Sequence, residues 1–197
     1  MSIAEKLVNI AEKIQRVFEL KDNKPYIDTR EITDWRFFNQ EGKRDFLLPK
    51  LDTSNGTNFY YFCRSATSLK VVPNNLNFSK ASQLYYAFYG CTSLHTVEYI
   101  DFSSIPITTS TDNRIFGIFY NCSALENITI KENSLKAPIS FEYSPLLSND
   151  SIQSIVDCLV STTGVAKKLT LHKDTYAKLT EAQFSTIANK GWEVVSA

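Results

Sequence analysis

The sequence predicts an α/β fold built around a short solenoid of about three to four rungs, with a cap at each end. The prediction rests on two repeated tracks whose spacings stay in step along the chain. The first track is read at Thr67-Ser68-Leu69, Thr92-Ser93-Leu94 and Ser123-Ala124-Leu125, and the second at Leu51-Asp52, Leu76-Asn77 and Ile100-Asp101. A period of about 25 residues with apolar side chains at fixed phases is typical of a leucine-rich-repeat solenoid.

Residues 51–147 form the predicted solenoid, in which each rung depends on its neighbours because it cannot bury its own apolar residues. The apolar residues expected to stack on their equivalents above and below are Phe88, Leu94, Val97 and Ile100. Short polar side chains are expected to close an Asx-type turn at each corner: Asp52, Asn77 and Asp101. The extra residues of the third period fit a protruding loop over 106–113.

Residues 1–20 are expected to form an amphipathic helix over 3–20, because Ser2 and Glu5 make a capping box ahead of a helical period. The docking or oligomerisation stripe of this helix consists of Ile3, Leu7, Ile10, Ile14 and Val17. Two uses of the stripe are open: docking onto the body of the chain or a neighbouring structural protein, or assembly of a homo-oligomer. Residues 21–50, rich in aromatic side chains, are expected to form an ordered N-terminal cap.

Residues 148–197 predict an α/β cap at the other end. A helix is expected to begin at 148–151 and to end near 162–164, and 169–171 predicts a strand. Thr180 and Gln183 make a second capping box, Gly191 suits a left-handed helix stop, and a last strand is expected at 192–195. Such a cap would cover the strand edge and the core that the last rung leaves open.

The repeat also carries a resemblance to a known family. The segments concerned are Ala87-Phe88-Tyr89-Gly90-Cys91-Thr92-Ser93-Leu94 and Phe119-Tyr120-Asn121-Cys122-Ser123-Ala124-Leu125. They resemble the repeat of BspA-like leucine-rich repeat proteins, and residues 144–171 and 188–192 are similar to the closing segment of such proteins encoded among phage tail genes and prophages of Gram-positive bacteria. The resemblance implies a non-enzymatic recognition or structural protein of a virion or cell surface.

Charge and hydropathy narrow the classes of partner. The 21 basic and 21 acidic residues cancel, so the chain lacks the electrostatic footprint of a nucleic-acid binder. No apolar run is long enough for a membrane-spanning helix, and the first residues do not have the pattern of a signal peptide. We therefore expect no nucleic acid and no membrane insertion, and a location in the virion or in the host cytoplasm.

Enzyme chemistry is disfavoured by the residues that the sequence offers. The cysteines, expected to be reduced and buried, are Cys63, Cys91, Cys122 and Cys158. His95 and His172 are expected at the surface, and no motif for a nucleophile, a metal or a phosphate is present. We predict no catalytic residue, no metal site and no cofactor. Glu98 with Asp101 is the acidic pair that a glycan hydrolase would use, which is the least favoured function.

Tyrosines are the candidate ligand-binding residues, because tyrosine offers a rigid ring and a hydroxyl at low entropic cost. The four candidates are Tyr85, Tyr86, Tyr89 and Tyr120. Adjacent tyrosines on a strand would point to opposite faces, so half of them are expected in the core. Tyr89 and Tyr120, which lie beside a turn, are expected outside.

The leading functional prediction is a phage tail-associated or receptor-binding protein that engages a host surface protein or glycan. The alternative is an intracellular, prophage-encoded interaction module that inhibits a host system. A distant third is the glycan hydrolase.

Overall fold

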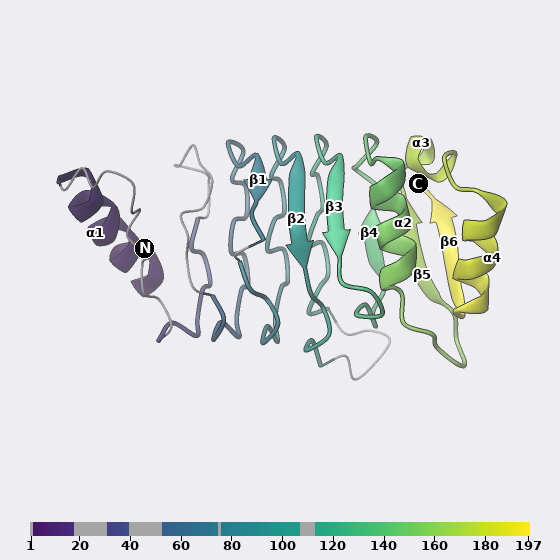
Figure 1. The fold of residues 1–197 in the computed structure, drawn as a ribbon, viewed down its shortest axis with the longest axis horizontal. Helices are drawn as coiled ribbons and strands as arrows, with labels where there is room; N and C mark the ends of the chain where they lie inside the picture. Colours follow the sequence, from purple (N-terminus) through teal and green to yellow (C-terminus); the bar gives the residue numbers. More distant parts are fainter. Residues whose placement is uncertain (1, 18–30, 40–52, 75, 107–112) are drawn as a thin grey trace.

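The computed structural model describes residues 2–17, 31–39, 53–74, 76–106 and 113–197. Its strands follow one another along the long axis in chain order (Figure 1). The helices are α1 (Ile3–Val17), α2 (Asn149–Cys158), α3 (Lys173–Tyr176) and α4 (Glu181–Asn189). The strands are β1 (Val71–Val72), β2 (Thr96–Ile100), β3 (Asn127–Ile130), β4 (Ile139–Phe141), β5 (Lys167–Leu171) and β6 (Trp192–Ser196).

The predicted leucine-rich-repeat solenoid is wrong, although the α/β class is right. Within the described ranges, the strands form two separate three-stranded parallel sheets, ordered β1-β2-β3 and β4-β5-β6, which four helices complete. Val71 pairs with Thr96, and Thr96 pairs with Asn127, so the first sheet is built from successive repeated segments. The register of β2 against β3 shifts between Val97 and Ile100, and the ladder ends at β3.

Helix α2 explains why the first sheet ends at β3. The Ser151 hydroxyl accepts a hydrogen bond from the Ile128 N–H at 2.9 Å, and the Ser154 hydroxyl accepts one from the Ile130 N–H at 2.8 Å. The Ser151 hydroxyl also donates to the Glu126 carbonyl at 2.8 Å. Serine side chains of a helix therefore occupy the place of a fourth strand and satisfy the strand edge. The sequence pattern of α2 shows only an amphipathic helix, which is why the division into two sheets was missed.

One hydrophobic core runs through both sheets. Phe119 stacks on Phe88 with ring centroids 5.8 Å apart, and on Phe141 of β4 with centroids 5.7 Å apart. The predicted core residues Phe88, Leu94, Val97 and Ile100 are all buried. The two sheets are separate in their hydrogen bonding but share their packing.

The polar corners form as predicted where the structure describes them. The Asn77 side chain accepts a hydrogen bond from the Ser79 N–H at 2.8 Å, and the Asp101 side chain accepts one from the Ser103 N–H at 2.7 Å. These are Asx turns, which fix the chain direction at each corner. Asp52 and residues 107–112 of the predicted protruding loop lie outside the described residues, as does most of the predicted 21–50 cap.

Helix α1 begins with the predicted capping box. The Ser2 N–H donates to the Glu5 carboxylate at 2.7 Å, and the Glu5 N–H donates to the Ser2 hydroxyl at 3.1 Å. Ala4 and Val8 are buried in the core. The buried face of the helix therefore lies next to the predicted stripe.

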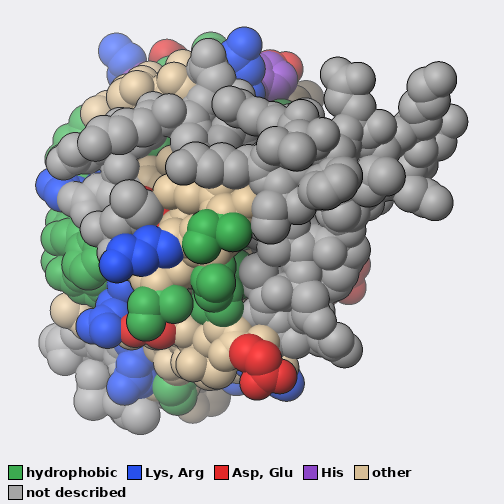
Figure 2. All heavy atoms as spheres, turned by 90° about the vertical axis from the view of Figure 1, so that its left-hand side faces the viewer, with side chains coloured by type: hydrophobic (Ala, Val, Ile, Leu, Met, Phe, Trp, Pro, Cys, Tyr) green, Lys and Arg blue, Asp and Glu red, His purple; other side chains and the backbone are tan. Residues whose placement is uncertain are grey.

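The predicted stripe of α1 points away from the body where its side chains are described. Ile3, Leu7 and Ile10 are exposed, and their use, in docking onto a neighbouring structural protein or in a homo-oligomer, stays a prediction. The side chains of Ile14 and Val17 lie outside the described ones. The view onto this end of the molecule shows hydrophobic side chains at the surface, with lysine or arginine side chains close to them (Figure 2).

The C-terminal elements largely match the prediction. Thr180 and Gln183 form the capping box of α4, Gly191 has a φ of 77°, and β5 and β6 cover the predicted strands. Helix α2 ends at Cys158, earlier than predicted, because the extended Leu159 forms a parallel bridge with Leu135. In the described part of the chain, no helix has the length and apolar character needed to cross a membrane.

Candidate functional site: an aromatic strip

Aromatic side chains from successive turns join into one continuous surface, which we call the aromatic strip. It consists of Phe37, Tyr60, Tyr61, Tyr85, Tyr86, Tyr89, Phe116, Tyr120 and Tyr143. Neighbouring ring centroids along the strip lie between 4.1 and 6.0 Å apart. The structure thus brings the four predicted ligand-binding tyrosines together, and each of them is half-buried.

Adjacent tyrosines share one side of the molecule, contrary to the expectation that half of them lie in the core. The rings of Tyr60 and Tyr61 are 4.1 Å apart, and those of Tyr85 and Tyr86 are 4.3 Å apart. These pairs lie in turns, and the second residue of each has a left-handed backbone, with φ of 55° at Tyr61 and 51° at Tyr86. The alternation of side chains holds only for extended strands, so it does not apply here.

The turns that carry the rings are linked by a repeated backbone hydrogen bond. The Phe37 N–H donates to the Tyr60 carbonyl, and the Tyr61 N–H donates in the same way to the Tyr85 carbonyl. The Tyr86 N–H then donates to the Phe116 carbonyl at 3.0 Å. Each left-handed residue is therefore tied to the next turn, which holds the rings at a fixed spacing.

The rings cover one another's faces. The rings of Tyr60 and Tyr85 are stacked 5.2 Å apart with 6° between their planes, and those of Tyr89 and Tyr120 have the same separation and angle. A ring stacked in this way presents mainly its edge and its hydroxyl to a ligand. The most open rings are those of Phe116, which is 54% exposed, and of Phe37 and Tyr143.

Three phenols of the strip, those of Tyr60, Tyr86 and Tyr120, have a raised pKa. A hydrogen bond with Tyr61 raises the pKa of Tyr60, and burial raises the pKa of Tyr86. The hydrogen bond between the hydroxyls of Tyr120 and Tyr143, 2.8 Å long, raises the pKa of Tyr120. These three phenols therefore stay neutral at physiological pH and offer hydroxyl groups beside the rings.

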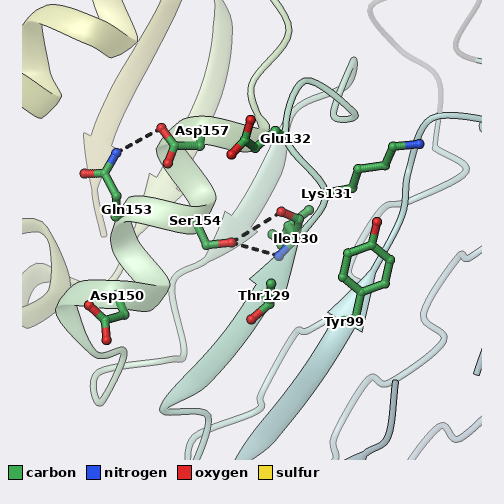
Figure 3. Close-up of a pocket in the computed structure, with 9 residues that line it drawn as sticks. All are labelled: Tyr99, Thr129, Ile130, Lys131, Glu132, Asp150, Gln153, Ser154 and Asp157. Atoms are coloured by element: carbon green, nitrogen blue, oxygen red, sulfur yellow. Dashed lines mark hydrogen bonds between the residues drawn. The ribbon is translucent and has the colours of Figure 1, made fainter. Parts of the chain in front are cut away.

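A second feature is an open hollow of about 620 Å³ between β2, β3 and α2 (Figure 3). Its lining residues are Tyr99, Thr129, Ile130, Lys131, Glu132, Asp150, Gln153, Ser154 and Asp157. Several of its polar groups are already engaged: the Lys131 ammonium contacts the Asp101 carboxylate at 2.9 Å, and the Gln153 amide donates to Asp157 at 2.9 Å. The hollow offers a weaker case for a ligand site than the strip does.

The acidic pair suggested for a hydrolase has other contacts. The Glu98 carboxylate accepts a hydrogen bond from the Asn74 N–H at 2.9 Å. Burial on its own would raise the pKa of Asp101, but hydrogen bonds from Ser103 and the Lys131 ammonium outweigh it and lower that pKa. A general acid needs the opposite shift, so Asp101 does not suit that role at neutral pH.

The cysteines and histidines take structural positions. All four thiols are free and buried, and burial raises the pKa of Cys91 and of Cys158 to about 12. Such thiols carry almost no thiolate at neutral pH. The exposed His95 contacts Glu126 at 2.6 Å, and His172 caps α3 by accepting the Asp174 N–H at 3.2 Å. Among the described residues, no group of histidine, cysteine and acidic side chains is placed to hold a metal ion.

The candidate set missed five rings of the strip, namely Phe37, Tyr60, Tyr61, Phe116 and Tyr143. The repeat could have predicted Phe116, because this residue aligns with Tyr60 and Tyr85. Tyr143 lies beyond the point where the repeat becomes unrecognisable in the sequence. It joins the strip because β4 carries the chain back beside Tyr120.

No protein-family model matches the chain, and no curated protein or solved structure matches it significantly. The resemblance to BspA-like proteins stays a prediction. The aromatic strip is therefore the feature that bears on function.

Proposed function

We propose that the chain is a non-enzymatic recognition protein that binds a partner protein through the aromatic strip. The observation that carries the proposal is the placement of large rings at left-handed backbone positions. Phe37, Tyr61 and Tyr86 have φ of 57°, 55° and 51°. For a side chain larger than glycine this conformation costs roughly 1–2 kcal/mol per residue.

The turn itself does not require these rings. Gly117 follows Phe116 as Tyr86 follows Tyr85, and it has a φ of 61° in the next turn. Glycine adopts this conformation without a steric cost. Bulky residues at the equivalent positions of the earlier turns therefore lower the stability of the fold. Residues with this kind of backbone strain cluster at binding sites. This is the physical support for a binding role of the strip.

The stacking of the rings favours a protein over a glycan as the partner. A sugar stacks on the open face of an aromatic ring, whereas the faces of Tyr89 and Tyr120 lie against each other. Edges and hydroxyl groups of tyrosine are what protein interfaces use, with aromatic residues enriched at their centres. Of the two partner classes that the sequence suggested, the geometry supports the protein.

Site-directed photo-crosslinking tests the proposal in cells of the organism that carries the gene and of its relatives. A benzophenone amino acid replaces Phe116 on the strip or, as a control, the 87% exposed Val165 far along the chain. We expect a discrete protein adduct from position 116 alone, and its loss when Tyr89 and Tyr120 are both changed to alanine. Equal adducts from both positions would overturn the proposal. Tyrosine-dependent binding on a glycan array without a protein adduct would also overturn it.

The biological setting is a separate proposal that rests on the sequence resemblance. A phage tail component would be found in purified particles in a fixed ratio to the major tail protein. An intracellular inhibitor of a host system would be absent from particles and would yield its adduct from the cytoplasm. Quantitative mass spectrometry of purified particles separates the two settings.

A further inference from the structure

We infer that the aromatic strip contains a dedicated anion site at Arg64, which receives an aspartate or glutamate side chain of the partner protein. The inference rests on the proposed function and adds the chemistry of the group that is recognised. The observation behind it is a guanidinium group held between tyrosine rings of two successive turns.

Arg64 is oriented by aromatic contacts. Its guanidinium carbon lies 4.8 Å from the centroid of the Tyr61 ring and 5.5 Å from that of the Tyr89 ring. Both distances are within the range of a cation–π interaction. The side chain is half-buried, so its orientation is restricted before any ligand arrives.

Within the described part of the chain, no carboxylate neutralises the charge of Arg64. Among the residues that the structure describes, none forms an ion pair with this guanidinium, whereas Arg36 is paired with Asp34 at 2.6 Å. Stacking on a ring uses the face of the guanidinium and leaves the in-plane N–H groups available. Those groups match a carboxylate in a two-point hydrogen bond.

The surroundings make this single charge selective. Arg64 lies against a strip made of tyrosine and phenylalanine rings, and residues 51–130 contain few charged side chains. One cation in a neutral aromatic surface adds little long-range attraction but a strong local preference. An acidic residue on an otherwise apolar or polar segment of a partner protein fits this arrangement, whereas a polyanion would need many cations.

Peptide selection tests the inference with defined probes. Random peptides displayed on a surface are selected on the wild-type chain, and those that no longer bind Phe116→Ala are kept as strip-dependent. We expect an aspartate or glutamate at one fixed position of these peptides. Arg64→Gln should weaken them roughly tenfold or more. Arg64→Lys should weaken them less, because it keeps the charge and loses the planar fork.

A double-mutant cycle makes the assignment specific. Changing the selected acidic residue to its amide should lower affinity for the wild type, and should have little further effect on Arg64→Gln. Lys168→Gln, which removes an exposed positive charge on β5, is the matched control and should leave affinity unchanged. Equal melting temperatures of the variants would show that Arg64→Gln acts on binding.

The outcomes separate the two proposals. Strip-dependent peptides without an enriched acidic position overturn the Arg64 site and leave the protein-binding strip standing. A failure to select any strip-dependent peptide counts against both. Arg64-dependent binding of a sialylated glycan, without acidic enrichment among peptides, would assign the site to a sugar carboxylate and overturn the inference.

Discussion

Residues 53–130 and 131–197 hold parallel segments together in different ways. In the first region, strands are two to five residues long, and turns are joined directly, as in the hydrogen bond from the Tyr61 N–H to the Tyr85 carbonyl at 3.0 Å. In the second region, helices pack beside the strands. Ser148 is the N-cap of α2, and Thr180 is the N-cap of α4. The first region, which we call the turn-built region, joins its turns directly to one another, and helix α2 closes its edge at β3. Its turns carry the rings of the aromatic strip side by side.

The largest expected effect on stability comes from a substitution in the core that the two regions share. Phe119 stacks between Phe88 and Phe141, so Phe119→Ala should lower the free energy of unfolding by about 3–5 kcal/mol. Urea denaturation should still show one transition, at a lower midpoint, because both regions use this core. Phe116→Ala, which removes an exposed ring, is the control with an effect of about 1 kcal/mol or less. Two transitions, of which only one shifts, would contradict the shared core.

The next effect concerns the helix that closes the first sheet. Ser151→Ala leaves the buried Ile128 N–H without its acceptor and should cost about 1–3 kcal/mol. Hydrogen exchange should accelerate at Ile128, while amides of β1 keep their protection. Ser185→Ala on the exposed side of α4 should change neither quantity. If Ser151→Ala behaves like Ser185→Ala, the sheet is closed by something other than the serine hydroxyls.

At the left-handed positions of residues 53–130, we expect two substitutions to affect stability differently. Gly117→Ala should destabilise the chain by about 1–2 kcal/mol, because its φ is 61° and an added Cβ would collide with the Tyr86 ring. Tyr61→Gly relieves a left-handed tyrosine, and this gain offsets the lost ring contacts to within about 1 kcal/mol. The same change should abolish strip-dependent binding. A Tyr61→Gly variant that keeps full binding would remove the link between backbone strain and function.

Local signals in the sequence were sufficient for the caps and corners. The capping box of Thr180 with Gln183 and the turn at Gly191 depend on residues a few positions apart, so they were predictable. The end of the first sheet was not, because Ser151 and Ser154 read as ordinary polar positions of an amphipathic helix. Their role appears only when α2 packs beside β3.

The candidate site was predicted in part for a related reason. Tyr85, Tyr86, Tyr89 and Tyr120 recur in phase and were found. Their common orientation was not, since it depends on the sign of φ at Tyr86, which a strand pattern does not reveal. Arg64 carries no signal of its own in the sequence. Its position between two rings follows from the spacing of neighbouring turns.

The smallest expected effect is a pH dependence at the junction of the two regions, where Asp101 meets Lys131 at 2.9 Å. The folded chain lowers the pKa of Asp101 below the value of about 3.9 in an unfolded chain. The resulting stabilisation is therefore complete above that unfolded value and is lost as the pH falls through the folded pKa. Asp101→Asn keeps an acceptor for the Ser103 N–H but cannot titrate. The free energy of unfolding, measured from pH 7 to pH 3, should fall less in this variant than in the wild type, while the exposed Glu193→Gln should follow the wild type. Equal losses in all three chains would show that the Asp101 pair contributes nothing to acid sensitivity.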